Sequence, residues 1–211
     1  MIVQGSEEWF AVRAGKVTAS RVADVIARTK TGYGASRANY AAQLVAERLT
    51  GTVEKGFTNA AMQWGTDQEP NAREAYEYRT GAFVDQVGFI DHPTIAMTGA
   101  SPDGLIGDDG MLEIKAPQTA THIETLLSRK IPGKYQTQMA WQMACAGRAW
   151  CDFVSYDPRL PSHMSLFVQR YERDDALIAE LEREVSIFLA EVEATVEQLR
   201  SAYPEPQAVA A

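Results

Sequence analysis

Hydrophobic and polar positions follow one another in a pattern that predicts helices and strands along the whole chain. Apolar residues at helical spacing, bounded by capping and glycine signals, predict helices over 6–15, 19–30, 35–49, 59–79, 119–127, 133–145 and 174–200. Runs rich in strand-forming residues predict strands over 83–91, 96–100, 103–106, 111–115, 150–156 and 165–171. The order predicts one α/β domain over residues 1–200, with a mixed central β-sheet flanked by helices.

Three segments modify this pattern. Pro70 falls inside a predicted helix and indicates a kink or a boundary there. The glycine-rich stretch 31–34, preceded by Arg28 and Lys30, is typical of a flexible basic loop. The last helix carries an apolar stripe opposite an acidic face, and a disordered tail is expected over 201–211.

The composition excludes several classes of protein for this chain. With 45% hydrophobic residues the chain can form a real core, while no signal peptide and no apolar run of membrane-spanning length is found. A cytoplasmic location without membrane attachment is therefore expected. The two cysteines, Cys145 and Cys151, are too few for a zinc or iron–sulfur site and predict buried, reduced thiols.

The net charge of −8 is unevenly distributed. Residues 1–60 hold eight Lys/Arg against five Asp/Glu, a net of +3, and residues 172–200 hold three against nine, a net of −6. This asymmetry can direct a nucleic acid toward one face of the molecule. The solvated face of an exposed helix is an equally good explanation of the acidic segment.

The most informative motif is Ser101-Pro102-Asp103-Gly104 followed, ten positions after the aspartate, by Glu113-Ile114-Lys115. The turn signal at 107–110 predicts a β-hairpin that brings Asp103 and Glu113 together, with Glu113 and Lys115 on one face and Ile114 on the other. Two carboxylates and an ammonium suit metal-assisted phosphodiester hydrolysis. Surface hairpins also carry such charges without any catalytic role.

Further blocks extend this motif, and together they resemble the phage lambda exonuclease-like alkaline exonucleases, or viral recombinases, of the PD-(D/E)xK nuclease superfamily. The resemblance covers about residues 5–190 and implies a restriction-endonuclease-like fold. The blocks, in chain order, are Trp9-x3-Arg13-x-Gly15-x-Val17-Thr18-Ala19-Ser20, Trp64-Gly65-x3-Glu69-x3-Arg73, Ser101-Pro102-Asp103-Gly104-Leu105, Leu112-Glu113-Ile114-Lys115-x-Pro117, Tyr135-x2-Gln138 and Tyr156-Asp157-Pro158-Arg159.

The resemblance implies a catalytic set. Asp103, Glu113 and the backbone carbonyl of Ile114 would hold Mg²⁺, for which Mn²⁺ can substitute, and two ions per site are expected. Lys115 would orient or deprotonate the attacking water, which requires a depressed pKa or help from the metal. Glu69 would complete the site through water or a second ion, although an (i, i+4) pair with Arg73 is the alternative.

The active-site glutamine implied by the resemblance is Gln138, with Gln136 and Gln142 as neighbouring candidates for the same position. A polar helix face without any catalytic role would explain the same residues.

A second implied set binds DNA. Arg13, Ser20 and Ser101 would bind the 5′-phosphate, Met62 would be a wedge at the terminal base pair, and Lys30 would contact the duplex. Arg13 as a helix C-cap, Ser20 as an ordinary helix residue and Met62 as a core residue are the alternatives.

The implied activity is 5′→3′ digestion of one strand of linear double-stranded DNA, giving 5′-mononucleotides and a 3′ overhang. A homotrimeric ring and a single-strand annealing protein as partner are also implied. An endonuclease using the same hairpin, or a non-catalytic DNA-end-binding module, remains the alternative.

Overall fold

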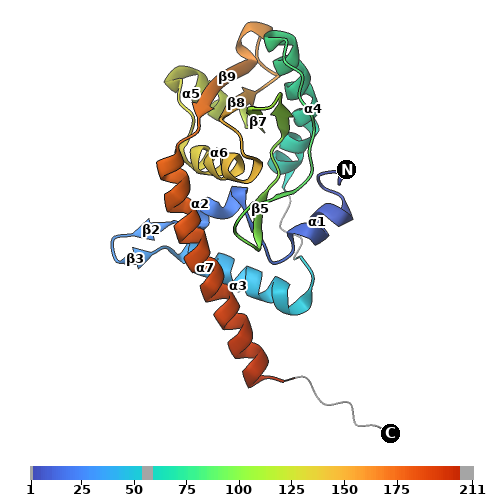
Figure 1. Cartoon of the computed structure of the whole chain (residues 1–211). Helices are drawn as coiled ribbons and strands as arrows, with labels where there is room; N and C mark the ends of the chain where they lie inside the picture. Colours follow the sequence, from blue (N-terminus) through green and yellow to red (C-terminus); the bar gives the residue numbers. More distant parts are fainter. Residues whose placement is uncertain (1, 54–58, 205–211) are drawn as a thin grey trace.

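The computed structural model describes residues 2–53 and 59–204, and in it helices connect a four-stranded, a three-stranded and a two-stranded sheet (Figure 1). The upper part contains a four-stranded sheet, and the lower part contains a bundle of helices around a short three-stranded sheet. Among the described residues, no helix combines the length and the apolar character needed to cross a bilayer.

The larger sheet has the strand order β6(Gly104–Ile106), β7(Gly110–Lys115), β8(Trp150–Tyr156) and β9(Leu166–Glu172). The predicted hairpin is confirmed, because β6 pairs antiparallel with β7 and Gly104 lies opposite Leu112. β7 pairs parallel with β8, and Lys115 lies opposite Ser155. β9 completes the sheet antiparallel to β8. The sheet is therefore mixed, as the sequence predicts.

Helices cover both faces of this sheet, and the two-residue period of the strands supplies both faces. Leu112 and Ile114 of β7 pack against Ala72 and Tyr76 of α4(Ala60–Thr80). The alternate side chains face α6(Gly133–Ala146), whose Met139 and Met143 pack with Met111, Cys151 and Phe153. Burial and nearby carboxylates raise the pKa of the Cys151 thiol well above its ordinary value.

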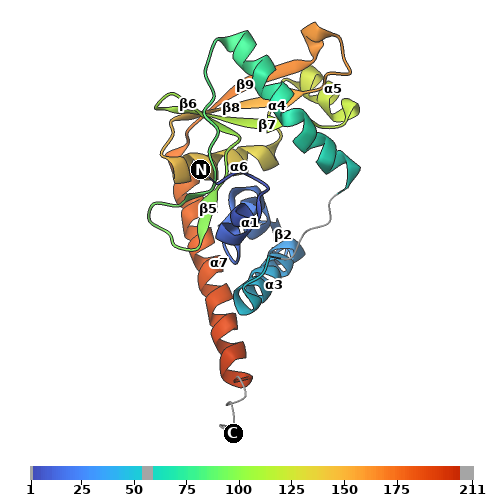
Figure 2. The same cartoon turned by 90° about the vertical axis from the view of Figure 1, so that its right-hand side faces the viewer.

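The second part of the structure surrounds the three-stranded sheet β1(Val17–Thr18), β5(Thr98–Ala100) and β4(Ile90–Asp91), in that spatial order. The helices around it are α1(Glu7–Arg13), α2(Val22–Val25), α3(Ala35–Thr50) and α7(Asp175–Ala202). α5(Thr119–Ser128) lies near the upper sheet, and α7 extends away from that sheet alongside α3 (Figures 1 and 2). The apolar stripe of α7 supplies Leu181, Val185 and Phe188 to the main core.

The structure differs in detail from the predictions for several segments. The strand expected over 83–91 is reduced to Ile90–Asp91 and a single bridge at Asp85, because Gln4 Nε2 bonds the Val87 carbonyl where a strand partner would lie. The flexible loop around Lys30 is a small hairpin, β2(Arg28–Thr29) and β3(Gly32–Tyr33).

The helix predicted over 19–30 is shortened by the same hairpin to a 3-10 turn at Ala19–Arg21 followed by α2. Pro70 lies inside a continuous α4. α7 reaches Ala202, so the first two residues of the expected tail 201–211 are helical, while 205–211 lie outside the described residues.

Candidate active site

The hairpin carries Asp103 to the end of β7, where Glu113 and Lys115 lie. The Asp103 N–H donates to the Leu112 carbonyl at 3.2 Å, and the Ile114 N–H donates to Asp103 Oδ2 at 2.6 Å. Glu113 and Lys115 face α6 and form an ion pair with one another, while Ile114 packs on the α4 face. The arrangement of these three side chains on the strand is therefore the one that the two-residue period predicts.

Two glutamines from α6 hold the carboxylate of Glu113, which is fully buried. Gln138 Nε2 donates to Oε1 at 2.7 Å, and Gln142 Nε2 donates to Oε2 at 2.7 Å. They are four residues apart and so share one side of the helix. Gln136 instead donates to the Ile131 carbonyl at 2.8 Å. The structure thus places both Gln138 and Gln142 at this carboxylate, and it turns Gln136 away.

Charges at this site act strongly on one another. Burial, the negative charge of Glu113 and a smaller effect of Glu69 raise the pKa of Asp103 well above its ordinary value, partly opposed by Lys115. Burial disfavours the charged form of Lys115, but Glu113 and Asp103 outweigh burial and raise the pKa of Lys115. The neighbouring carboxylates thus shift the pKa of Lys115 in the direction opposite to the depression considered from the sequence, which favours the other expected route, help from the metal.

Glu69 reaches the site through an arginine. Its Oε1 accepts from Arg73 Nη2 at 2.6 Å, and the same nitrogen lies 3.4 Å from the Asp103 carbonyl oxygen. The (i, i+4) pair expected as the alternative is thus present, and it also links α4 to the hairpin. Both readings of Glu69 are compatible with this geometry.

Few side chains at this site could hold a metal ion. Within residues 2–53 and 59–204, no three His, Cys, Asp or Glu side chains gather closely enough to hold an ion, so Glu69 does not join Asp103 and Glu113 in one cluster. The two carboxylates and the Ile114 carbonyl nevertheless offer the oxygen donors that Mg²⁺ prefers. Burial and, after it, the negative charges of Glu113 and Glu69 raise the pKa of Asp103, and a divalent cation held between the carboxylates would offset both effects.

A tryptophan connects two of the residues expected to bind the 5′-phosphate. Trp9 Nε1 donates to Ser101 Oγ at 2.9 Å, and the Arg13 guanidinium carbon lies 3.6 Å from the centroid of the Trp9 ring. Burial lowers the pKa of Arg13 to about 10, opposed by Tyr40 and Glu47. The spacing Trp9-x3-Arg13 could have paired these two side chains on one helix side, whereas the contact with Ser101, 92 residues away, has no signal in the sequence.

Gly15 fixes the chain just after Arg13. Its φ of +66° is in the left-handed region, and a Cβ there would lie 2.7 Å from Arg48 Cγ. The Gly15 N–H donates to Glu47 Oε2 at 2.8 Å, and its carbonyl accepts from Arg48 Nε at 3.0 Å. These bonds attach the end of α1 to α3.

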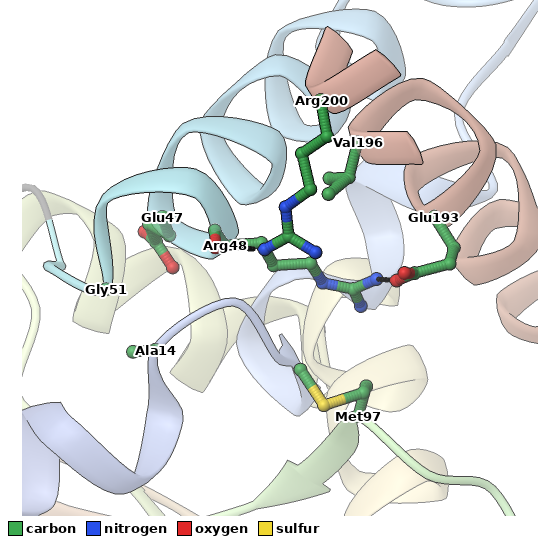
Figure 3. A pocket seen from close by; sticks show the side chains of 8 residues that line it. All are labelled: Ala14, Glu47, Arg48, Gly51, Met97, Glu193, Val196 and Arg200. Atoms are coloured by element: carbon green, nitrogen blue, oxygen red, sulfur yellow. Dashed lines mark hydrogen bonds and ion pairs between the residues drawn. The ribbon is translucent and has the colours of Figure 1, made fainter. Parts of the chain in front are cut away.

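A cavity of about 310 Å³ lies on the other side of this attachment, between α3 and the end of α7 (Figure 3). Its arginines bond within the protein: Arg48 pairs with Glu193 at 2.7 Å, and Arg200 donates to the Arg48 carbonyl at 3.4 Å. The residues that line it are Ala14, Glu47, Arg48, Gly51, Met97, Glu193, Val196 and Arg200. Asp103, Glu113 and Lys115 do not line this cavity.

The other expected DNA-binding residues lie at the surface. Ser20 is exposed in the 3-10 turn, Lys30 is exposed at the tip of the β2–β3 hairpin, and Met62 on α4 is 56% exposed. The core alternative for Met62 is therefore wrong. In the described part of the chain, no hydrogen bond or ion pair joins these side chains to Asp103 or Glu113.

Comparison with known proteins shows what the chain is similar to. The model of the YqaJ-like viral recombinase domain matches residues 8–149. A crystal structure of an alkaline exonuclease (LHK-Exo) from Laribacter hongkongensis is 61% identical with a TM-score of 0.88, and the match covers 93% of this chain and 97% of that one. A second crystal structure, with the same values, is LHK-Exo in complex with dAMP.

A more distant structure supports the fold alone. A phage-related exonuclease from Haemophilus somnus 129PT is 14% identical with a TM-score of 0.72, over 87% of this chain and 96% of that one. The comparison with curated protein sequences gives no significant match.

Proposed function

Because the chain belongs to the YqaJ-like viral recombinase family, we propose that it is a metal-dependent exonuclease that digests linear double-stranded DNA in the 5′→3′ direction. Family membership and the 61% identical alkaline exonuclease support a DNA exonuclease role. The observation that carries the proposal is the convergence of Asp103, Glu113 and Lys115 at the end of β7. The dAMP bound to LHK-Exo belongs to the class of product that such an enzyme releases.

The side chains of this chain divide the chemistry among them. Asp103, Glu113 and the Ile114 carbonyl would hold Mg²⁺, with Glu69 acting through water or a second ion; the metal supplies Lewis acidity and lowers the pKa of water. Lys115, an ammonium here, orients the attacking water or donates to a phosphate oxygen. Gln138 and Gln142 hold Glu113 in one orientation.

We expect the residues that bind the terminal 5′-phosphate to set the direction of digestion. Arg13 and Ser101, which Trp9 connects, offer a guanidinium and a hydroxyl to a phosphate dianion, with Ser20 as a further donor. Ser101 precedes Asp103 by two residues, so a phosphate bound there places the next phosphodiester near the carboxylates. Only a strand with a 5′-phosphate gains this positioning.

The proposed function also includes an assembly and a partner protein. A homotrimeric ring around DNA would give processivity despite a net charge of −8, because the ring rather than positive charge retains the DNA. The 3′ overhang left by digestion would pass to a single-strand annealing protein, and the reaction would take place in the cytoplasm.

End-labelled duplexes test the proposal directly. With Mg²⁺, we expect digestion of linear DNA that favours a 5′-phosphate over a 5′-hydroxyl, releases mononucleotides and spares closed circles. Asp103→Asn and Glu113→Gln should abolish digestion and keep the fold, and Arg13→Ala should remove the 5′-phosphate preference. Cleavage of closed circles would favour the endonuclease, and DNA-end binding without any hydrolysis would favour the non-catalytic module.

A further inference from the structure

The loop after β8 carries Asp157 and Arg159, which have no role in the chemistry described above. Asp157 is fully buried directly beyond the last paired residues of β8. Because β8 runs parallel to β7 and Ser155 lies opposite Lys115, this loop leaves the sheet at the same end as the active-site side chains.

Arg159 connects this loop to two other parts of the molecule. Asp157 Oδ1 accepts from Arg159 Nε at 2.7 Å, and Oδ2 accepts from Nη2 at 3.1 Å. Nη2 also donates to the carbonyl of Pro117, two residues after Lys115, at 3.0 Å. The guanidinium carbon lies 4.5 Å from the centroid of the Trp64 ring on α4. One side chain thus touches the loop, the end of β7 and α4.

Among residues 2–53 and 59–204, the N-terminal half of α4 has few other attachments. Residues 60–63 are exposed, and Trp64 is the first residue of the helix with a partly buried side chain. Within the described part of the chain, Trp64 Nε1 is buried without a hydrogen-bond partner, and the face of its ring lies under Arg159. By contrast, the C-terminal half is held by Tyr76, which donates to Asp152 at 2.8 Å, and by Arg79, which donates to the Leu166 carbonyl at 2.9 Å.

The position of this half-helix decides where two expected functional residues lie. Met62 and Glu69 are seven residues apart, two helical turns, so they lie on the same side of α4. Figure 2 shows α4 crossing the sheet, with its N-terminal half extending past the strands. A shift of this half would therefore move Met62 and Glu69 together, relative to Asp103 and Lys115.

We propose that Arg159 is a positioning residue that clamps the N-terminal half of α4 to the end of β7 through Trp64 and Pro117, and so sets the distance between the wedge Met62 and the active site. The role of Met62 in this statement rests on the proposed function, whereas the clamp itself does not. Strand separation at the DNA end would then depend on Arg159 more strongly than hydrolysis does.

The first measurement needs no DNA. Hydrogen exchange of α4 amides should become faster over 60–69 in Arg159→Ala, with 70–80 little changed, and Arg159→Lys should restore part of the protection. Arg170→Ala is the matched control, because Arg170 also pairs with a buried aspartate, Asp152, and lies 3.5 Å from the centroid of a tryptophan ring, Trp150. Unchanged exchange over 60–69 in Arg159→Ala would overturn the clamp.

The second measurement compares digestion from a fully paired 5′-phosphorylated end with digestion from the same end carrying terminal mismatches. Arg159→Ala should slow initiation by about ten-fold on paired ends and much less on mismatched ends, because mismatches remove the unstacking cost that the wedge must meet. Met62→Ala should show the same selectivity, and the double variant should be no worse than the poorer single one.

The results of the two measurements distinguish a failure of the Arg159 clamp from a failure of the proposed exonuclease function. An equal loss on both ends would mean that Arg159 acts on DNA or on the chemistry directly, and it would overturn the positioning role. No loss on either end would overturn it as well. If wild-type protein digests neither substrate, the proposed function fails, and hydrogen exchange still decides whether the clamp exists.

Discussion

At the scale of single residues, the carboxylate of Glu113, a proposed metal ligand, is held by neutral amides. Both of its oxygens accept from glutamines of α6, and Lys115 forms an ion pair with it. Amide donors fix the orientation of a carboxylate without neutralising its charge. Glu113 is therefore held in one orientation although it is fully buried.

Gln142→Met tests this arrangement because it keeps the side-chain length and removes the donor to Glu113 Oε2. We expect a fall in kcat/KM of about ten-fold to a hundred-fold, as for other partners of metal ligands, with a larger Mg²⁺ requirement. Gln136→Met is the control, since Gln136 bonds the Ile131 carbonyl instead, and it should retain nearly full activity. A Mg²⁺ titration of DNA digestion makes the comparison, and equal effects of the two variants would contradict it.

The sequence predicts a contact within the site only where the two residues lie close together along the chain. The hairpin motif predicts that Asp103 and Glu113 meet, and the i, i+4 spacing of Gln138 and Gln142 is visible in the sequence. The connecting role of Trp9 is not visible there, because Ser101 is 92 residues away. The exposure of Met62 depends on which side of α4 meets the sheet, which only the packing decides.

At the scale of elements, the end of α1 is positioned by α3 through Gly15. Its left-handed backbone and its two hydrogen bonds to Glu47 and Arg48 set the direction in which the chain leaves Arg13. The short strand β1 follows at once and pairs with β5, which leads to Ser101. The sequence does not predict β1, because two residues give no periodicity and its partner lies 81 residues away.

Gly15→Ala should therefore impair both stability and end recognition. We expect a loss of about 1–3 kcal/mol in the free energy of unfolding, from the strained φ and the close approach of Arg48, together with a weaker preference for 5′-phosphate ends. Gly51→Ala is the matched control, because Gly51 has a similar φ of +68° but open space around its Cβ position. It should cost about 1–2 kcal/mol and leave end preference intact. Urea unfolding measures the change in stability, and digestion of 5′-phosphate ends compared with 5′-hydroxyl ends measures the change in end preference.

The β2–β3 hairpin is anchored to α7 rather than free. Glu184 accepts from Tyr33 Oη at 2.8 Å and from Arg28 at 3.0 Å, and the Tyr33 ring lies against Arg28 and Arg37. The Tyr33 hydrogen bond, opposed by burial and helped by Arg28, lowers the pKa of Glu184. Lys30 is thus carried on a defined arm.

Glu184→Gln should loosen this arm and destabilise the protein by about 1–2 kcal/mol at neutral pH. Because the folded pKa lies below the unfolded one, the contribution is complete above the ordinary carboxyl pKa of about 4.3 and is lost as pH falls through the folded pKa. The stability difference between wild type and variant should therefore shrink in acid. Glu197→Gln, on the exposed side of α7, should change little at any pH.

At the scale of the whole molecule, charge is separated along the chain and in space. The acidic residues of 172–200 lie mostly on α7, which extends away from the four-stranded sheet that carries Lys115 (Figure 1). With a net charge of −8, the protein has little general attraction for DNA, and the proposed ring would supply the retention that charge does not.

Salt should consequently affect the start of digestion more than its continuation. If initiation relies on about two phosphate contacts, raising salt four-fold should slow it by about ten-fold. The length digested per binding event, measured with a competitor trap added after initiation, should barely change if a closed ring holds the duplex. A parallel fall in both quantities would argue for an open, dissociating monomer, and sedimentation would give the number of subunits.

The burial of both thiols has a practical consequence for handling this protein. Cys145 is 6% exposed and Cys151 is fully buried, so neither presents a thiolate to oxidants or alkylating reagents while the chain is folded. Storage without reductant should be harmless. Labelling of Cys151 by iodoacetamide would instead report how often the interior between α6 and the four-stranded sheet opens, and labelling of Cys145 how often the core around α7 opens.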